Sequence, residues 1–280
     1  MIKVNNTPKY RITDRESVTA FAVYLGLSLF FFGRALIGHF GDRYIGLGAD
    51  PPSSMLSIVW MRHALEGRVN PFQVNVIWTP DGIDLAHTAD SLLVAAVLAP
   101  ISLAIGVVRA YNALALLAPA LSGWSAFVLY RRICGNHQAA LVGASMFSFS
   151  PFLLGHLVGQ TNLYILWFIP LAVYLVLLRL ANEISTRRFG VYLALALIAQ
   201  FGCSLELFAT MTLFGGIALA LAWGMGDADL RARLTALMPP LARSYAVTAL
   251  IASPYLYYFF AFGPIEMASM RDLTLAWHLR

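Results

Sequence analysis

The chain has little charge and few cysteines. Only 12% of its 280 residues are Asp, Glu, Lys or Arg, about half the fraction that is usual for a soluble domain. Its two cysteines, Cys134 and Cys203, lack metal-ligand spacing, and the sequence contains no zinc-spaced Cys/His cluster, no Gly-rich phosphate loop of the strand–helix type and no evident internal repeat. An ordinary soluble domain, a zinc module and a P-loop protein are therefore excluded.

Apolar residues are abundant instead. They make up 59% of the chain, and the mean hydropathy is +0.71. A membrane-spanning helix needs roughly 20 consecutive, mostly apolar residues. Seven stretches approach or meet that length: Val18 to Phe32 extended to Gly38, Val107 to Tyr130, Gln138 to Leu154, Leu163 to Leu180, Val191 to Leu207, Met211 to Trp223 and Tyr245 to Phe262. The predicted fold is an all-α, polytopic membrane protein with about seven transmembrane helices.

The net charge of +5 does not indicate nucleic acid as a partner, because the basic residues cluster at the ends of the apolar stretches, as in the positive-inside pattern. The first apolar stretch is too long for a signal peptide and has no small-residue cleavage site behind it. Residues 1–16, with Lys3, Lys9, Arg11 and Arg15, are therefore predicted to be a cytoplasmic tail. Residues 17–280 are predicted to form a single transmembrane domain.

A shorter apolar run, Ser91 to Ile105, decides the topology. Three arginine-rich turns follow it, at Arg131–Arg132, Arg187–Arg188 and Arg231 to Arg243. If the run crosses, all three lie outside, opposite the N-terminal lysines; if it only enters the interface, all three lie inside with them. The run is short and contains Pro100, which disfavours a helix interior. We therefore expect Ser91 to Ile105 to form a re-entrant or interfacial helix and residues 38–107 to form a first external loop. In this topology Cys134 and Cys203 lie near opposite faces, so we expect no disulfide between them.

The first external loop has internal order. Pro51-Pro52-Ser53-Ser54 is a helix-start signal, so Met55 to Glu66 is predicted to be a short helix that ends at Gly67 and lies along the membrane surface. Asn70-Pro71-Phe72 and Thr79-Pro80-Asp81-Gly82 are typical of turns.

Two acids follow the first span. A carboxylate at a membrane face can act as a general base or hold a divalent cation. Asp42 precedes Arg43, and an ordinary ion pair between them is the alternative for that acid. Asp50 directly precedes the predicted surface helix, which would hold it near the bilayer. We therefore favour Asp50 as the functional acid.

Other polar residues stand near the same predicted face. His87, in a run with Asp81, Asp84 and Asp90, could be a base, a ligand or an interfacial anchor, with a structural role as the alternative. His156, Gln160 and Asn162 flank the corner after the third span, where capping and turn formation explain Gly159 and Asn162 but not the other two.

Glu206 lies within the fifth apolar stretch. An ionisable group in a span costs a few kcal/mol and is a functional hypothesis by default. The alternative is that the span ends near Cys203 and leaves Glu206 at the external rim. Arg34 and Arg109, near external helix ends, could attract a phosphate or extend to lipid headgroups.

A series of short motifs occurs between about Gly41 and Phe208. They are Gly48-Ala49-Asp50-Pro51, Ser57-Ile58-Val59-Trp60, His63-Ala64-Leu65, Gly67 and Asn70-Pro71-Phe72; Pro80-Asp81-Gly82 with Leu85; Ala110-Tyr111-Asn112 through Arg131-Arg132; Phe147-Ser148-Phe149-Ser150-Pro151-Phe152, then His156, Gly159, Asn162-Leu163 and Pro170-Leu171; and Gln200-Phe201 with Glu206-Leu207-Phe208-Ala209-Thr210. In this order they resemble GT-C membrane glycosyltransferases, in particular bacterial members related to the dolichyl-phosphate-mannose and aminoarabinose transferases.

The resemblance implies transfer of a sugar from a polyprenyl-phosphate carrier to an extracytoplasmic acceptor, in a bacterial inner (plasma) membrane. An acid in the first external loop is the catalytic base of this superfamily, and Asp50 matches that position. The corner after the third span helps to bind a divalent metal or the lipid phosphate; Gln160 and Asn162 stand where other branches carry an acid. Asp50 is then also the candidate metal ligand, and a re-entrant helix before the second span is a further superfamily feature.

A second function class stays open. The same scaffold could serve a non-catalytic lipid-carrier-binding, flippase-like or assembly protein. GT-C enzymes usually have more spans, whereas this chain stops at Arg280, soon after the seventh predicted span. A C-terminally truncated product, a minimal family member and an inactive remnant are all compatible with that end.

Overall fold

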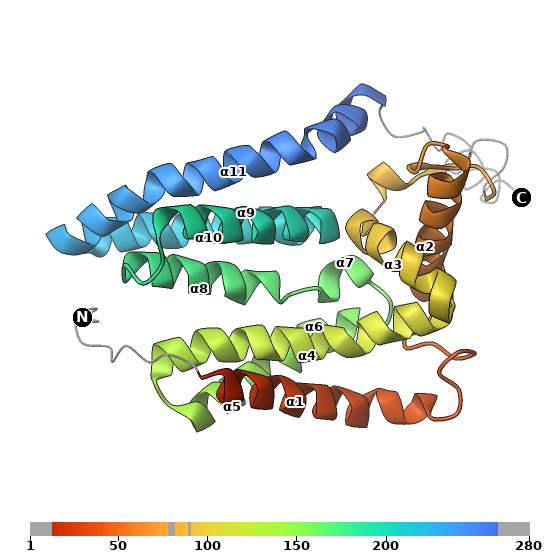
Figure 1. Ribbon diagram of the computed structural model, residues 1–280, viewed down its shortest axis with the longest axis horizontal. Helices are drawn as coiled ribbons and strands as arrows, with labels where there is room; N and C mark the ends of the chain where they lie inside the picture. The colour runs from red at the N-terminus through yellow and green to blue at the C-terminus, as the bar shows by residue number, and fades with distance from the viewer. Residues whose placement is uncertain (1–12, 78–81, 89–90, 263–280) are drawn as a thin grey trace, which may run out of the picture.

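The computed structural model describes residues 13–77, 82–88 and 91–262, and within these ranges it is mostly helical with almost no strand. Long helical segments lie side by side along the long axis of the molecule (Figure 1). They are α1 (Asp14–Phe31), α4 (Val107–Cys134), α5 (His137–Ser148) followed by α6 (Pro151–His156), α7 (Thr161–Tyr164) followed by α8 (Phe168–Leu180), α9 (Thr186–Cys203), α10 (Leu205–Met225) and α11 (Ala228–Phe262). The all-α prediction is confirmed.

Five helical segments among the described residues are long and apolar enough to cross a membrane. They are Val107–Cys134, His137–His156, Thr161–Leu180, Leu205–Met225 and Ala228–Phe262. Along α10, large apolar side chains such as Leu213 and Phe214 are more than half exposed, at 60% and 63%, as expected of a surface that contacts lipid. The two other predicted spans correspond to α1 and α9, which have charged residues in their first turns.

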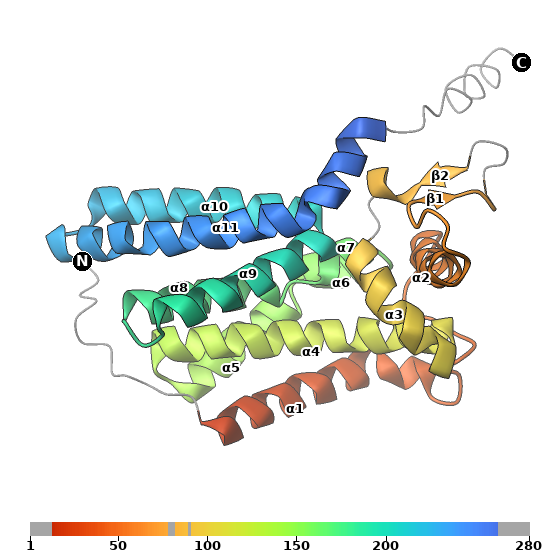
Figure 2. The same ribbon diagram turned by 45° about the horizontal axis from the view of Figure 1, so that its top comes forward.

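The basic turns gather at one end of the bundle. The start of α1 and the turns α4–α5, α8–α9 and α10–α11 all lie at this basic end (Figures 1 and 2). The junction between η2 (Gly33–Leu36) and α2 (Asp50–Gly67) and the junctions α6–α7 and α9–α10 lie at the opposite end. The prediction that Arg131–Arg132 and Arg187–Arg188 share one side therefore holds in the fold.

The segment between α1 and α4, predicted to be the first external loop, folds beyond the opposite end. After η2 (Gly33–Leu36) come α2 (Asp50–Gly67), a short antiparallel pair of β1 (Gln73–Val74) and β2 (Ile83–Asp84), η3 (Leu85–His87) and α3 (Leu92–Ile105). The helix predicted after Pro51–Ser54 is present, and Arg68 follows it with a left-handed φ of 52°. The predicted turn residues Thr79 to Asp81, and Asp90, lie outside the described residues.

The helix α3 has 14 residues, about 21 Å at 1.5 Å per residue, which is short of a bilayer core of about 30 Å. It packs on α2 and on α4 at the end opposite the basic turns (Figure 2). Pro100 does not break it, because the helix continues to Ile105.

Several predicted boundaries are wrong. The stretch Val191 to Leu207 is two helices, because α9 ends at Cys203 and the Ser204 side chain accepts from the Leu207 N–H at 3.1 Å to start α10. The segment Arg231 to Arg243 is not a loop, since α11 continues through it and through its prolines. The first helix ends at Phe31 rather than near Gly38, and it begins at Asp14, inside the predicted tail.

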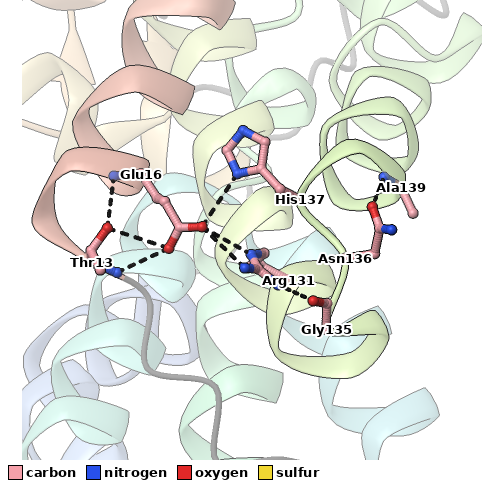
Figure 3. Close-up of polar contacts among 7 residues, drawn as sticks. All are labelled: Thr13, Glu16, Arg131, Gly135, Asn136, His137 and Ala139. Carbon is pink, nitrogen blue, oxygen red and sulfur yellow. Dashed lines mark hydrogen bonds and ion pairs between the residues drawn. The ribbon is translucent and has the colours of Figure 1, made fainter.

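Buried polar contacts join α1 to α4 and α5 at the basic end. Arg131 is 2% exposed, and its guanidinium lies 3.0 Å from the Glu16 carboxylate (Figure 3). His137 Nδ1 approaches the same carboxylate at 3.4 Å. Thr13 and Glu16 form a reciprocal capping box at the start of α1, so one acid serves both the helix cap and the buried arginine.

Farther along these helices the packing is close. A Cβ atom added to Gly123 would lie 2.6 Å from the Tyr24 ring, and the Tyr24 hydroxyl donates to the Leu141 carbonyl at 2.9 Å. Cys134, exposed at the basic end, and Cys203, buried at the opposite end, are both free, as expected from their predicted positions.

Candidate functional site

Asp50 is the first residue of α2, and the structure holds it against the corner between α6 and α7. A Cβ atom added to Gly159 would lie 2.8 Å from the Asp50 Cβ atom and 2.5 Å from Pro51 Cδ. Nearby, the Leu47 N–H donates to the Val158 carbonyl at 2.8 Å. Only a residue without a side chain fits at Gly159, so this glycine permits the close approach that brings Asp50 to the corner.

A buried asparagine fixes the chain that leads to Asp50. Asn112 of α4 is fully buried, its Oδ1 accepts from the Ile45 N–H at 3.0 Å, and its Nδ2 donates to the Phe40 and Arg43 carbonyls at 3.0 and 2.7 Å. Sequence reasoning had not marked Asn112 as a site residue. The available signal was an amide in an otherwise apolar span, which must find partners when buried.

Asp50 faces a polar cavity of about 350 Å³. The cavity is lined by Asp50, Ser53, Ser54, Ile83, Thr88, Gly159, Gln160, Thr161, Asn162, Leu163 and Glu206. The structure thus brings together Asp50, the predicted corner and Glu206, which come from three separate parts of the chain.

Glu206 lies at the start of a helix and not in its interior. Because α9 ends at Cys203, Glu206 falls in the first turn of α10 and is exposed. A carboxylate in the first turn of a helix is favoured by the helix dipole. The expected helix end near Cys203 is therefore observed, and Glu206 lines the same cavity as Gln160 and Asn162.

A larger apolar cavity adjoins the polar one. It measures about 420 Å³ and takes most of its walls from α3, α9 and α11, including Leu92, Leu93, Phe201, Ile251 and Tyr255. Thr88, Asn162 and Glu206 line both cavities. The two therefore form one amphiphilic site, polar at Asp50 and apolar between the helices.

His87 lies at the edge of this site, where the segment between α1 and α4 contacts α11. Its Nε2 is 3.1 Å from the Phe259 carbonyl, its Nδ1 is 3.3 Å from Asp84 Oδ2, and its ring stacks on Phe259 at 4.4 Å. The Tyr258 hydroxyl donates to the same Asp84 oxygen at 3.2 Å. His87 thus joins two distant segments and does not line either cavity.

Four other residues predicted for the site lie at the same end of the bundle but outside both cavities: Asp42, His156, Arg34 and Arg109. The His39 ring lies 3.0 Å from the Asp42 carboxylate, so His39, and not Arg43, is the partner of Asp42; this hydrogen bond is the main cause that lowers the pKa of Asp42. His156 Nδ1 lies 2.6 Å from the Phe152 carbonyl in its own helix.

The two predicted phosphate-binding arginines are engaged elsewhere. Arg109 donates to the Ile105 carbonyl at 3.3 Å and packs beside Gly41, and Arg34 lies 5.7 Å from the centre of the Phe30 ring. Within residues 13–77, 82–88 and 91–262, no lysine or arginine lines either cavity.

The polar cavity offers oxygen donors. Asp50 and Glu206 supply carboxylates and Gln160 and Asn162 supply amides, which are the donor types that Mg²⁺ and Ca²⁺ bind. Among the described residues, no group of three His, Cys, Asp or Glu side chains is close enough to hold a metal ion. Amide and hydroxyl oxygens would therefore have to complete such a site.

The chain was compared with known protein families, curated proteins and solved structures. No family model, no curated protein and no solved structure matches the chain.

Proposed function

We propose that the chain is a membrane glycosyltransferase of the GT-C type, which moves a sugar from a polyprenyl-phosphate carrier to an extracytoplasmic acceptor. One observation carries the proposal: the polar cavity at Asp50 and the apolar cavity between α3, α9 and α11 share Thr88, Asn162 and Glu206. An amphiphilic donor needs this pairing, because its sugar requires polar partners whereas its isoprenoid chain requires apolar surface.

The cavity residues then have distinct roles. The amides of Gln160 and Asn162 hydrogen-bond sugar hydroxyls, and Leu92, Phe201 and Tyr255 contact the isoprenoid chain. Asp50 accepts the proton of the acceptor hydroxyl as its oxygen attacks the anomeric carbon. The bond from that carbon to the phosphate oxygen breaks, and the polyprenyl phosphate leaves with the electron pair.

The donor phosphate requires positive charge that the described cavity walls lack. Arg34 and Arg109 were expected to supply it, but both lie outside the cavities. We therefore assign this role to a divalent cation held by oxygen atoms of Asp50, Glu206 and the cavity amides. When bound, such a cation would supply positive charge beside the donor phosphate.

The orientation follows from charge. With the basic end in the cytoplasm, as the positive-inside pattern requires, the N-terminus is cytoplasmic and the cavities open on the extracytoplasmic side of a bacterial inner membrane. The chain then crosses seven times, with α1 and α9 as the two additional spans and α3 as a re-entrant or interfacial helix.

Single-cysteine labelling from outside intact cells tests this topology. A reagent that does not cross membranes should label Leu47→Cys, at a position 76% exposed before α3, and Ile105→Cys, at a position 38% exposed at its end. The native Cys134, exposed at the basic end, should react only after the membrane is opened. Labelling of the two introduced cysteines from opposite sides would show that α3 crosses.

Transfer itself can be measured in proteoliposomes. The purified chain is supplied with a panel of polyprenyl-phosphate hexoses and pentoses carrying radioactive sugar, and transfer to a membrane extract is followed together with donor binding. We expect binding and transfer of at least one donor. Binding of a donor without any transfer would instead support the lipid-carrier function, and no binding would contradict both.

Gly159→Ala should reduce transfer about tenfold or more, because the new Cβ atom would overlap Pro51 Cδ and Asp50 Cβ and force α2 away from the corner. Gly155→Ala is the matched control at the same corner, since its Cβ atom would meet nothing within 4 Å. Initial rates and melting temperatures of both variants should be compared. Equal rates would mean that the contact between α2 and the corner is not needed for the reaction.

A further inference from the structure

Besides the two cavities, a groove lies between α9 and α11, toward the basic end. It has a volume of about 570 Å³, and its walls include Val191, Leu195 and Val247. Ser244 of α11 donates to the Gly190 carbonyl of α9 at 3.1 Å, so the two helix backbones are in close contact beneath it. The groove is therefore a feature of helix packing and does not depend on a flexible loop.

Two cations line this groove, one from each helix. Arg187 lies in the first turn of α9 and Arg243 lies on α11, and both are exposed. Among the described residues, neither side chain has an ion pair or a hydrogen bond, whereas neighbouring basic residues are paired, as Arg132 is with Glu183 and Arg233 with Asp229. Two unpaired cations on opposite walls of an apolar groove form a site for an anionic amphiphile.

We propose that this groove binds an anionic phospholipid of the leaflet at the basic end, with its phosphate between Arg187 and Arg243 and an acyl chain along α9 and α11. The first-turn amides of α9 add a favourable field for the phosphate. An isoprenoid tail that entered the groove from the apolar cavity would carry no charge near Arg187 and Arg243, so the two arginines would not stabilise it. Charge complementarity therefore selects the phospholipid.

The chain of this lipid would reach the apolar cavity. Ile198 and Ile251 line both the groove and the apolar cavity, and from Arg187 to Ile198 the helix rises about 16 Å. The bound acyl chain would thus contact the side of the cavity that faces the basic end. The proposal stands independently of the transferase function, because it uses only residues of the groove.

The test is native mass spectrometry of the detergent-purified chain titrated with dioleoyl phosphatidylglycerol, dioleoyl phosphatidylcholine or soluble glycerol phosphate. Phosphatidylglycerol should bind at least about tenfold more tightly than phosphatidylcholine, since each arginine beside an anionic headgroup contributes about 1 kcal/mol. Equal affinity for the two lipids, or equal binding of glycerol phosphate alone, would overturn the proposal.

The matched variants separate a site from general surface charge. The double variant Arg187→Gln/Arg243→Gln should lose the preference, whereas Arg188→Gln/Arg233→Gln removes the same charge outside the groove and should keep it. Val247→Trp, which fills the groove from its exposed wall, should weaken phosphatidylglycerol binding without lowering the melting temperature. Equal losses in the two double variants would show that net charge, and not this groove, attracts the lipid.

Discussion

Replacing Asp50 by asparagine is expected to lower sugar transfer by about 10²–10⁴-fold, the usual cost of losing a positioned general base. The amide keeps the shape of the side chain but cannot accept the acceptor proton. Asp50 is exposed at the first turn of α2, where its charge contributes at most about 1 kcal/mol through the helix dipole. Folding should therefore survive, so the loss should appear in the transfer rate and not in the melting temperature.

Asp42→Asn is the control for this prediction. Asp42 is also an aspartate between α1 and α4, but its side chain is 68% exposed and pairs with His39. Neither Asp42 nor His39 lines either cavity. Its variant should transfer sugar at close to the wild-type rate. If Asp42→Asn is inactive and Asp50→Asn is not, the wrong aspartate has been assigned. If neither affects an active protein, the GT-C mechanism does not apply.

Hydropathy and charge were sufficient to predict the all-α fold and the end of the bundle shared by the turns at Arg131–Arg132 and Arg187–Arg188, because apolar length and terminal arginines are properties of the sequence itself. They failed where a local contact decides the boundary. Ser204 caps α10 within an unbroken apolar run. The segment Arg231 to Arg243 is polar enough to resemble a loop, yet Leu234 and Leu237 are buried in the core beside α9, and that packing keeps it helical.

The site was predictable only in part for the same reason. Asp50, Gln160, Asn162 and Glu206 share a cavity because each ends or begins a helix at the same end of the bundle, which the topology implies. The position of His87 follows from its contact with Phe259, a residue 172 positions away, and no sequence pattern indicates such a pair. Composition identified candidate side chains, whereas tertiary contacts decided which of them face the cavity.

Glu16→Gln should destabilise the folded chain by about 3 kcal/mol or more, as expected when a buried arginine loses its carboxylate. The Arg131 side chain is 3% exposed and lies 3.0 Å from the Glu16 carboxylate. Glutamine can still complete the capping box at the start of α1, so the change isolates the charge from the cap. Unfolding of the detergent-purified protein, followed by tryptophan fluorescence, measures the effect.

Two further variants test whether the buried charge is the cause. Glu16→Leu combined with Arg131→Met removes both charges and should recover most of the loss, because an apolar pair of similar volume often equals a buried ion pair in stability. Asp229→Asn breaks the pair with Arg233, whose side chain is 32% exposed, and should cost no more than about 0.5 kcal/mol. If Glu16→Gln unfolds like the wild type, α1 is held to α4 by apolar packing such as that of Tyr24 on Gly123, and the ion pair at the basic end serves orientation rather than stability.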